Sequence, residues 1–112
     1  MSDEKRLYRR VKVGAKSLVY DGNNEYEGTL KDISENGVGI IVNKEDGEVL
    51  EKSDTLELVV LDDEDIRHIN TRIVRSEKRD GSMIIGGRIK NQKDVADYVR
   101  SKETEEYLDN LK

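Results

Sequence analysis

Two short segments in the first third of the chain carry side chains suited to binding an anion or a nucleotide base. The first reads RLYRRV, residues 6–11, and places Arg6 and Arg10 four positions apart. A guanidinium can bond a phosphate or the O6/N7 edge of guanine with two parallel donors, and its flat face can stack on a base. Two such groups can clasp one ligand. Arginine clusters are also common in solvated basic tails, so this segment alone does not specify a site.

The second segment reads DISENG, residues 32–37. An ionised Asp32 only accepts hydrogen bonds, so it can take them from the N1–H and the exocyclic amine of guanine. Ser34 can add one more bond, and Gly37 lets a ligand approach the backbone. The same residue types also build ordinary turns, because Asp, Ser and Asn side chains bond nearby backbone and glycine adopts positive φ. Taken alone, the segment is compatible with a turn and with a binding site.

Other kinds of chemistry find no support in the sequence. The chain has no cysteine, which excludes disulfides, thiolate chemistry and zinc fingers, and its one histidine, His68, has no partner at metal-ligand spacing. We interpret His68 as a surface residue. The acidic run DDED, residues 62–65, lacks the spacing of a calcium loop and is interpreted as a solvated turn. No P-loop, dinucleotide-binding glycine motif or catalytic triad is recognisable. We therefore predict no enzymatic activity, no metal and no cofactor.

Composition and charge narrow the class of protein. The 112-residue chain has the length of one domain, with 40% charged residues and a net charge of −5, which argues against non-specific binding to nucleic acid. Residues 1–20 nevertheless hold six basic and two acidic side chains, so an anion could dock there. No apolar run approaches the roughly 20 residues of a membrane span, and the N-terminus lacks the apolar segment of a signal peptide. These features predict a soluble, cytoplasmic protein.

Apolar and polar residues alternate along six segments, which is the period of half-buried strands. The predicted strands cover about residues 11–19, 25–33, 37–43, 55–61, 66–76 and 83–90. DGNN at 21–24 and the DG pair at 80–81 predict hairpin turns. Short strands without an intervening helix long enough for a crossover favour an antiparallel sheet, and closure into a barrel would remove its edges. The polar segment 43–54 is predicted to be a loop.

From about Gln92 the pattern changes to that of a helix with two apolar faces. The first face carries Val95, Tyr98 and Val99, and the second carries Tyr107, Leu108 and Leu111. This change of face predicts that the helix either breaks or changes its packing partner. The expected join is SKET, residues 101–104, with Thr104 as the N-cap of a second helical segment.

Together the two N-terminal segments resemble the paired signatures of the PilZ domain family, in that family's order and rough spacing. Arg6 and Arg10 match the RxxxR motif, and Asp32, Ser34 and Gly37 match [D/N]xSxxG. GVGI, residues 37–40, continues as is usual in the family. IGGRI, residues 85–89, is similar to the family's last-strand glycine segment, with Ile89 where an aromatic is usual. That departure concerns packing rather than ligand chemistry.

The resemblance implies a six-stranded antiparallel β-barrel with a C-terminal α-helix that binds cyclic di-GMP (c-di-GMP), a bacterial second messenger. Asp32 and Ser34 would then read a guanine edge, while Arg6 and Arg10 would hold phosphates and the second guanine. Arg9 is an alternative to Arg10, because a register shifted by one would pair it with Lys5. The family places its second arginine directly before an apolar strand residue, so Val11 favours Arg10.

The resulting prediction is a receptor with a flexible basic arm at residues 1–10, a barrel at 11–90 and a C-terminal helix at 91–112. Ligand binding would order the arm and alter contacts with an effector protein that the sequence does not identify. One alternative is a PilZ-like interaction module that binds no nucleotide. Another is a small barrel for single-stranded nucleic acid, which the scattered placement of the five tyrosines disfavours. The number of bound ligands and the oligomeric state stay open.

Overall fold

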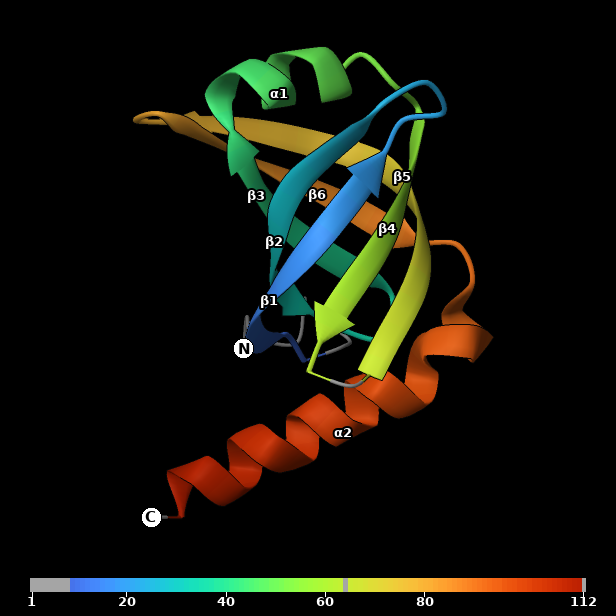
Figure 1. The fold of residues 1–112 in the computed structure, drawn as a ribbon. Coiled ribbons are helices and arrows are strands. Elements are labelled where there is room, and N and C mark those ends of the chain that lie inside the picture. The colour runs from blue at the N-terminus through green and yellow to red at the C-terminus, as the bar shows by residue number, and fades with distance from the viewer. Residues whose placement is uncertain (1–8, 64, 112) are drawn as a thin grey trace, which may run out of the picture.

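The computed structural model describes residues 9–63 and 65–111. The strands are β1 (Val11–Tyr20), β2 (Glu25–Ile33), β3 (Gly37–Asn43), β4 (Thr55–Asp62), β5 (Asp65–Arg79) and β6 (Ser82–Ile89). The helices are α1 (Lys44–Leu50) and α2 (Gln92–Asn110). The strands close into an antiparallel barrel in the order β1-β2-β3-β6-β5-β4, with β4 paired back onto β1 (Figure 1). The predicted six-stranded barrel with a C-terminal helix is confirmed.

The barrel interior is filled by the apolar residues whose alternation predicted the strands. Each strand contributes at least one side chain without solvent exposure, for example Val19, Leu30, Ile40, Leu58, Ile69 and Ile85. Burying an aliphatic side chain of this size contributes about 1.5–3 kcal/mol to stability. The sequence has few apolar residues, but most of those on the strands are buried, with Ile66 and Val74 as exposed exceptions. This reconciles the high charge content with an ordered fold.

Hairpin chemistry sets the register of the first two strands. The Asp21 carboxylate accepts hydrogen bonds from the backbone N–H groups of Asn23 and Asn24, both at 2.8 Å. This turn places Tyr20 opposite Glu25. The second predicted hairpin, at the DG pair, joins β5 to β6, and β5 begins slightly earlier and ends later than the predicted 66–76.

A β-bulge near Gly14 shapes the start of β1. Gly14 has a φ of +77°, and the pairing with β2 shifts between Lys12 and Ala15. Glycine adopts this backbone conformation without the strain that a side chain would cause. Beyond the bulge, Val11 is buried opposite Ile33 at the end of β2. The bulge thus delivers the residue before Val11 to the end of β2.

The segment predicted to be a loop at 43–54 instead contains α1, so that prediction is wrong. Asn43 caps the helix by accepting a hydrogen bond from the Asp46 N–H at 2.8 Å. Leu50 is fully buried, and Gly47 packs closely against Met83 of β6. The apolar stripe of a seven-residue helix is too short to be recognised by its period. In the folded protein, the N-cap and the buried leucine are sufficient to form the helix against the barrel end.

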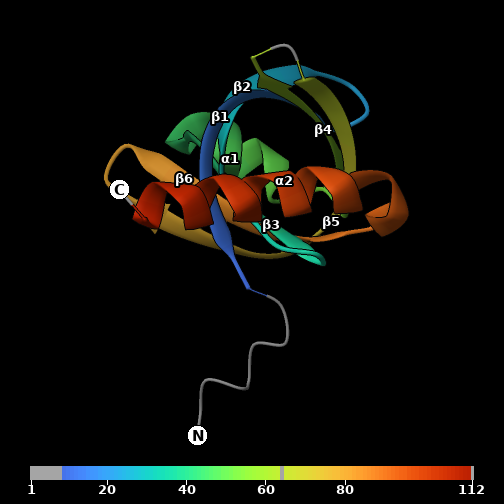
Figure 2. The same cartoon turned by 90° about the horizontal axis from the view of Figure 1, so that it is seen from below.

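The predicted break near residue 101 is also wrong, because α2 runs without interruption from Gln92 to Asn110. Its first half lies across one end of the barrel (Figure 2). Val95, Tyr98 and Val99 are buried there, and the Tyr98 hydroxyl donates to the Asp62 carboxylate at 2.8 Å. Thr104 is therefore inside the helix and not an N-cap. Neither proline nor glycine interrupts residues 92–110, so the helix continues past the end of its buried face.

Ion pairs fix this half of α2 to the barrel. The Lys102 ammonium lies 2.6 Å from the Asp62 carboxylate, and Arg67 of β5 bonds both Asp97 oxygens at 2.8 and 2.9 Å. The second half of α2 leaves Tyr107, Leu108 and Leu111 exposed. In residues 9–63 and 65–111, neither helix combines the length and the apolar content needed to traverse a bilayer.

Candidate functional site

Arg10 and Asp32, one from each predicted motif, meet at the end of the barrel where β1 begins and β2 ends. The Arg10 Nη1 atom donates to Asp32 Oδ1 at 2.7 Å. Their side chains are 25% and 15% exposed, so the pair is partly buried but can be reached from solvent. Val11 pairs with Ile33 and Lys12 with Asp32, and this register brings the motifs together across 22 residues of sequence.

The Asp32 carboxylate also contacts the Lys31 ammonium and lies next to Gly39. Lys31 donates to Asp32 Oδ2 at 2.9 Å. On the neighbouring strand Gly39 is directly opposite, and a Cβ there would lie only 2.6 Å from Asp32 Oδ1. Partial burial alone would raise the pKa of Asp32, but hydrogen bonds from Lys31 and Arg10 outweigh it and hold the pKa below its ordinary value. Asp32 is therefore an ionised acceptor at neutral pH.

Ser34 and Gly37 form the tight turn that joins β2 to β3. The Ser34 hydroxyl is buried and accepts hydrogen bonds from the N–H groups of Gly37, at 3.1 Å, and Asn36, at 3.4 Å. A Cβ on Gly37 would lie 3.1 Å from Arg10 Nη2 and 3.2 Å from the Gly87 carbonyl oxygen. Gly37 is thus needed where the Arg10 head group crosses the turn, and the Ser34 hydroxyl fixes the shape of that turn.

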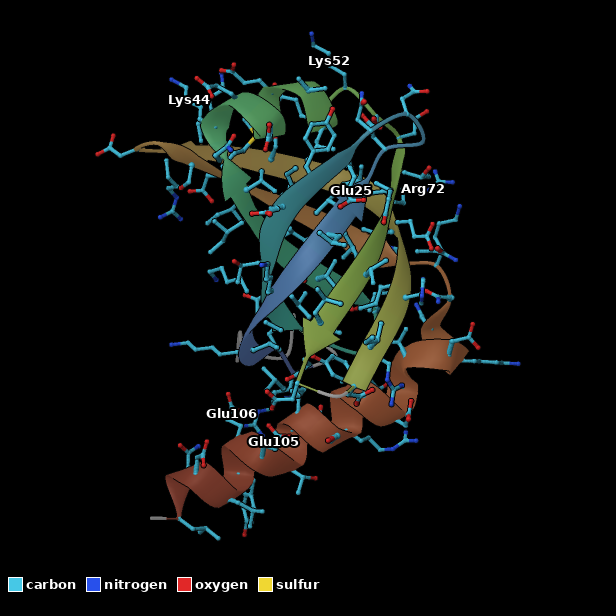
Figure 3. All side chains as sticks on the ribbon, in the orientation of Figure 1. Glu25, Lys44, Lys52, Arg72, Glu105 and Glu106 are labelled. Carbon is cyan, nitrogen blue, oxygen red and sulfur yellow. The ribbon has the colours of Figure 1, made fainter. Side chains whose placement is uncertain are left out.

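Arg9 points to a different partner. Its guanidinium pairs with Glu106 on α2, 97 residues further along the chain. Figure 3 shows Glu105 and Glu106 on the side of α2 that faces the start of β1. A hollow of about 450 Å³ next to this contact is lined by two lysines and three acidic residues of α2: Lys12, Lys102, Glu105, Glu106 and Asp109. Consecutive arginines therefore reach two different elements, which agrees with the choice of Arg10 as the site residue.

The structure brings together some of the predicted residues and places two further residues beside them. Of the predicted residues, Arg10, Asp32, Ser34 and Gly37 lie together, Arg9 precedes β1 and pairs with Glu106 of α2 instead, and Arg6 falls outside the described residues. Lys31 and Gly39 were missed. Lys31 follows Leu30 at a register shift in β2, so its contact depends on a bulge that the alternating pattern does not reveal. Gly39 could have been found from its place two residues after Gly37 on the same outward face.

A larger hollow of about 730 Å³ lies at the other end of the β1–β2 hairpin. Its charged lining includes Asp21, Glu25 and Glu57, against a single lysine, Lys90, and His68. His68 is exposed, as predicted, and its ring lies 3.1 Å from Glu57. Three carboxylates disfavour an anionic ligand there, so the Arg10–Asp32 end is the better candidate. No group of acidic, histidine or cysteine side chains in the described residues is arranged to hold a metal ion.

The arrangement around Asp32 can recognise a ligand that has both donors and negative charge. Asp32 offers carboxylate lone pairs, while Arg10 offers guanidinium donors beside it. Gly37 and Gly39 put no side chain of their own next to these groups, and the Arg10 and Asp32 side chains lie directly over their backbone. A guanine edge satisfies the carboxylate, and a phosphate satisfies the guanidinium.

Comparisons with known proteins agree with this geometry. A sequence model of the PilZ domain matches residues 4–102, which include both motifs and the whole barrel. A search of curated protein sequences finds no significant match.

Solved structures share the fold. The PilZ domain of YcgR from Escherichia coli, determined with c-di-GMP, superposes with a TM-score of 0.69 at 13% identity, over 96% of this chain and 98% of that one. MotI, an inhibitor of motility from Bacillus subtilis, gives 0.64 at 14% identity over 89% of this chain and 52% of its own. PlzA from Borreliella burgdorferi, in complex with c-di-GMP, gives 0.62 at 8% identity over 74% and 44%. The chain therefore spans about half the length of MotI.

Proposed function

The chain belongs to the PilZ domain family, and from this membership we propose that it is a c-di-GMP receptor rather than an enzyme. One observation carries the proposal: Arg10 and Asp32, from separate motifs, meet at 2.7 Å over glycine-bearing backbone. The proposal implies a bacterial, cytoplasmic protein. The ligand-bound state of YcgR and PlzA lends it further support, as a property of those two proteins.

Each site residue has a proposed part in ligand binding. Asp32 accepts from the N1–H and the amine of one guanine, and Arg10 donates to a phosphate or to the second guanine. Ligand binding breaks the Arg10–Asp32 ion pair, but each group gains a new charge-assisted bond, so the exchange leaves neither group unpaired. Ser34 acts by holding the turn, since its hydroxyl already bonds the Gly37 N–H.

The signal is proposed to leave the site through the N-terminal arm. Arg6 precedes β1 in the sequence and matches the first arginine of the motif. A dianionic ligand would pair with Arg6 and Arg10 and draw the arm across the barrel end. Arg9 lies between the two and contacts Glu106. An ordered arm would then present a changed surface beside α2 for an effector protein to recognise.

Calorimetric titration with c-di-GMP, compared with GMP and cyclic di-AMP, tests the proposal directly. Wild-type protein is expected to prefer c-di-GMP. Arg10→Ala is expected to weaken binding by more than about 2 kcal/mol, because a partly buried charge-assisted contact is lost. Arg9→Ala is the matched control and is expected to cost much less, since Arg9 is 56% exposed and paired with α2.

Two outcomes would contradict the proposal. Absence of c-di-GMP binding by the folded wild-type protein would leave the family's nucleotide-free interaction module as the better description. Equal losses for Arg9→Ala and Arg10→Ala would show that the ligand does not distinguish the two arginines, and the proposed register of the clamp would be wrong.

A further inference from the structure

The outer face of β3 and β6 next to the site is built from glycines. Gly39 is directly opposite Gly86, with Asp32 beside the first and Arg75 beside the second, in one cross-strand row. In the adjoining row Gly37 is opposite Arg88. We call Gly37, Gly39 and Gly86 the glycine floor. Paired residues share one face of a sheet, so these glycines leave a strip of backbone with no side chains of its own.

Side chains from both sides lie over this floor. Asp32 Oδ1 comes within 2.6 Å of the position of a Cβ on Gly39, and Arg75 Nε within 2.7 Å of that on Gly86. Because such positions on opposed residues are about 5 Å apart, the Asp32 carboxylate and the Arg75 head group lie within about 11 Å of each other. A bound nucleotide is long enough to contact both the Asp32 carboxylate and the Arg75 head group.

The far side of the floor carries unneutralised positive charge. Arg72 and Arg88 are directly opposite each other on β5 and β6, and Arg75 follows on β5; all three are exposed, and Figure 3 shows Arg72 pointing away from the barrel. Within residues 9–63 and 65–111 none of these guanidiniums has an ion pair or a side-chain hydrogen bond. Like charges directly opposite on a sheet are destabilising. In a chain of net charge −5, such a cluster is better explained by an anionic ligand than by stability.

We propose that Arg75 and Arg88 are ligand-binding residues, and that the nucleotide site extends from Asp32 across the glycine floor to these arginines, which bind a phosphate of the ligand. The inference rests on the proposed c-di-GMP binding and adds residues that lie outside both sequence motifs. Arg88 is opposite Gly37, over which the Arg10 head group lies, so Arg10 and Arg88 approach the floor from two sides. A phosphodiester between them has donors on both flanks.

Calorimetric titration of charge-removing variants tests this inference. Arg75→Met and Arg88→Met keep an apolar stem of similar length but remove the guanidinium. Each is expected to bind c-di-GMP at least tenfold more weakly than wild type, with a thermal midpoint no lower than that of wild type, because removing one of several like charges relieves repulsion. Arg79→Met is the matched control: it lies on the same hairpin, is paired with Glu77, and is expected to stay within twofold of wild type. The affinity of the two test variants should also depend less steeply on salt concentration, which a purely structural role would not change.

Gly86→Ala provides an independent variant that leaves every charge in place. Its added methyl group would displace Arg75, so it should weaken binding, and combining it with Arg75→Met should add little. If wild type binds, Arg10→Ala does not, and both methionine variants match wild type, only this inference is overturned. If wild type fails to bind, the proposed function falls together with the inference.

Discussion

At the scale of single residues, Asp32 shows how one carboxylate can serve two states of the site. Without ligand it is held by Arg10 and Lys31, which keep its pKa below the ordinary value even though partial burial acts in the opposite direction. In the proposed ligand-bound state, the same ionised oxygens would accept hydrogen bonds from guanine once Arg10 had turned to a phosphate. The residue needs no change of protonation for this exchange.

Selectivity is the property that should depend most on Asp32. Asp32→Ala is expected to narrow the preference for c-di-GMP over cyclic di-AMP, because a carboxylate rewards the N1–H and amine of guanine but repels the ring nitrogen of adenine. Titration of both ligands with wild type and variant gives the two affinity ratios. The proposed contact would be refuted by a ratio that does not change.

The site was predictable to the extent that it is local in the sequence. Arg10, Asp32, Ser34 and Gly37 occur within two short motifs, so residue types and spacing suffice to identify them. The place of Lys31 beside Asp32 depends on a strand bulge, and the proposed part of Arg75 and Arg88 depends on the pairing of β3, β6 and β5. Residue type alone does not reveal which distant arginine borders a glycine floor, since that requires the register of three strands.

At the scale of elements, α2 is held at the barrel end by one aromatic anchor and two ion-pair groups. Tyr98 is 1% exposed, lies between the cations of Arg67 and Lys102, each 5.5 Å from its ring centre, and donates to Asp62. The apolar pattern predicted the buried face correctly. It did not predict that a single helix would run through residues 101–104 without a break, because exposed helical turns are stabilised locally and leave no apolar period.

Removing the Tyr98 hydroxyl should measurably weaken the docking of α2. Tyr98→Phe is expected to lower the free energy of unfolding by about 1–2 kcal/mol, because a buried hydrogen bond to a carboxylate is lost. Tyr107→Phe is the control, since Tyr107 is 59% exposed, and should change stability by less than about 0.5 kcal/mol. Urea denaturation measures both, and equal effects would rule out the anchoring role of Tyr98.

The Arg67–Asp97 pair should make α2 docking sensitive to acid. Hydrogen bonds from Arg67 lower the pKa of Asp97 to about 2 from an ordinary value of 3.8. A lowered pKa in the folded state means that the contribution is complete above about pH 4 and is lost as the pH falls towards 2. The difference in urea midpoint between wild type and Asp97→Asn should therefore be constant from pH 7 to 5 and shrink below pH 4. A difference that persists unchanged to pH 2 would contradict this.

At the scale of the whole molecule, barrel closure explains why alternation was enough to predict the strands and their antiparallel pairing, while the resemblance to the family supplied the barrel. By closing into a barrel, six amphipathic strands bury their apolar faces and pair both edges of the sheet. The strand order is less accessible, since β3 pairs with β6 across about forty intervening residues, and no local signal encodes that pairing. The short α1 was missed because its N-cap and its one buried leucine stabilise a helix only when the barrel end is present to pack against.

The proposed response of the whole molecule is ordering of the arm. Residues 1–9 offer few apolar anchors in the sequence, and fixing a backbone residue costs about 1–2 kcal/mol, so we predict a mobile arm that becomes ordered with ligand. Hydrogen exchange on residues 3–9, with and without c-di-GMP, measures this. Strong protection already present without ligand would mean that the signal leaves by another route.

Arg9 and Arg10 are consecutive, yet one contacts Glu106 on α2 and the other contacts Asp32 in the site. The two contacts are therefore thermodynamically linked if the arm moves as one piece. If ligand binding breaks the Arg9–Glu106 pair, it costs the free energy of that pair. A protein that binds Glu106 breaks the same pair beforehand and so removes this cost from ligand binding. By this reciprocity, an effector bound to the acidic face of α2 would change c-di-GMP affinity by the same factor as c-di-GMP changes affinity for the effector. The effector would then help to set the second-messenger concentration at which the receptor responds.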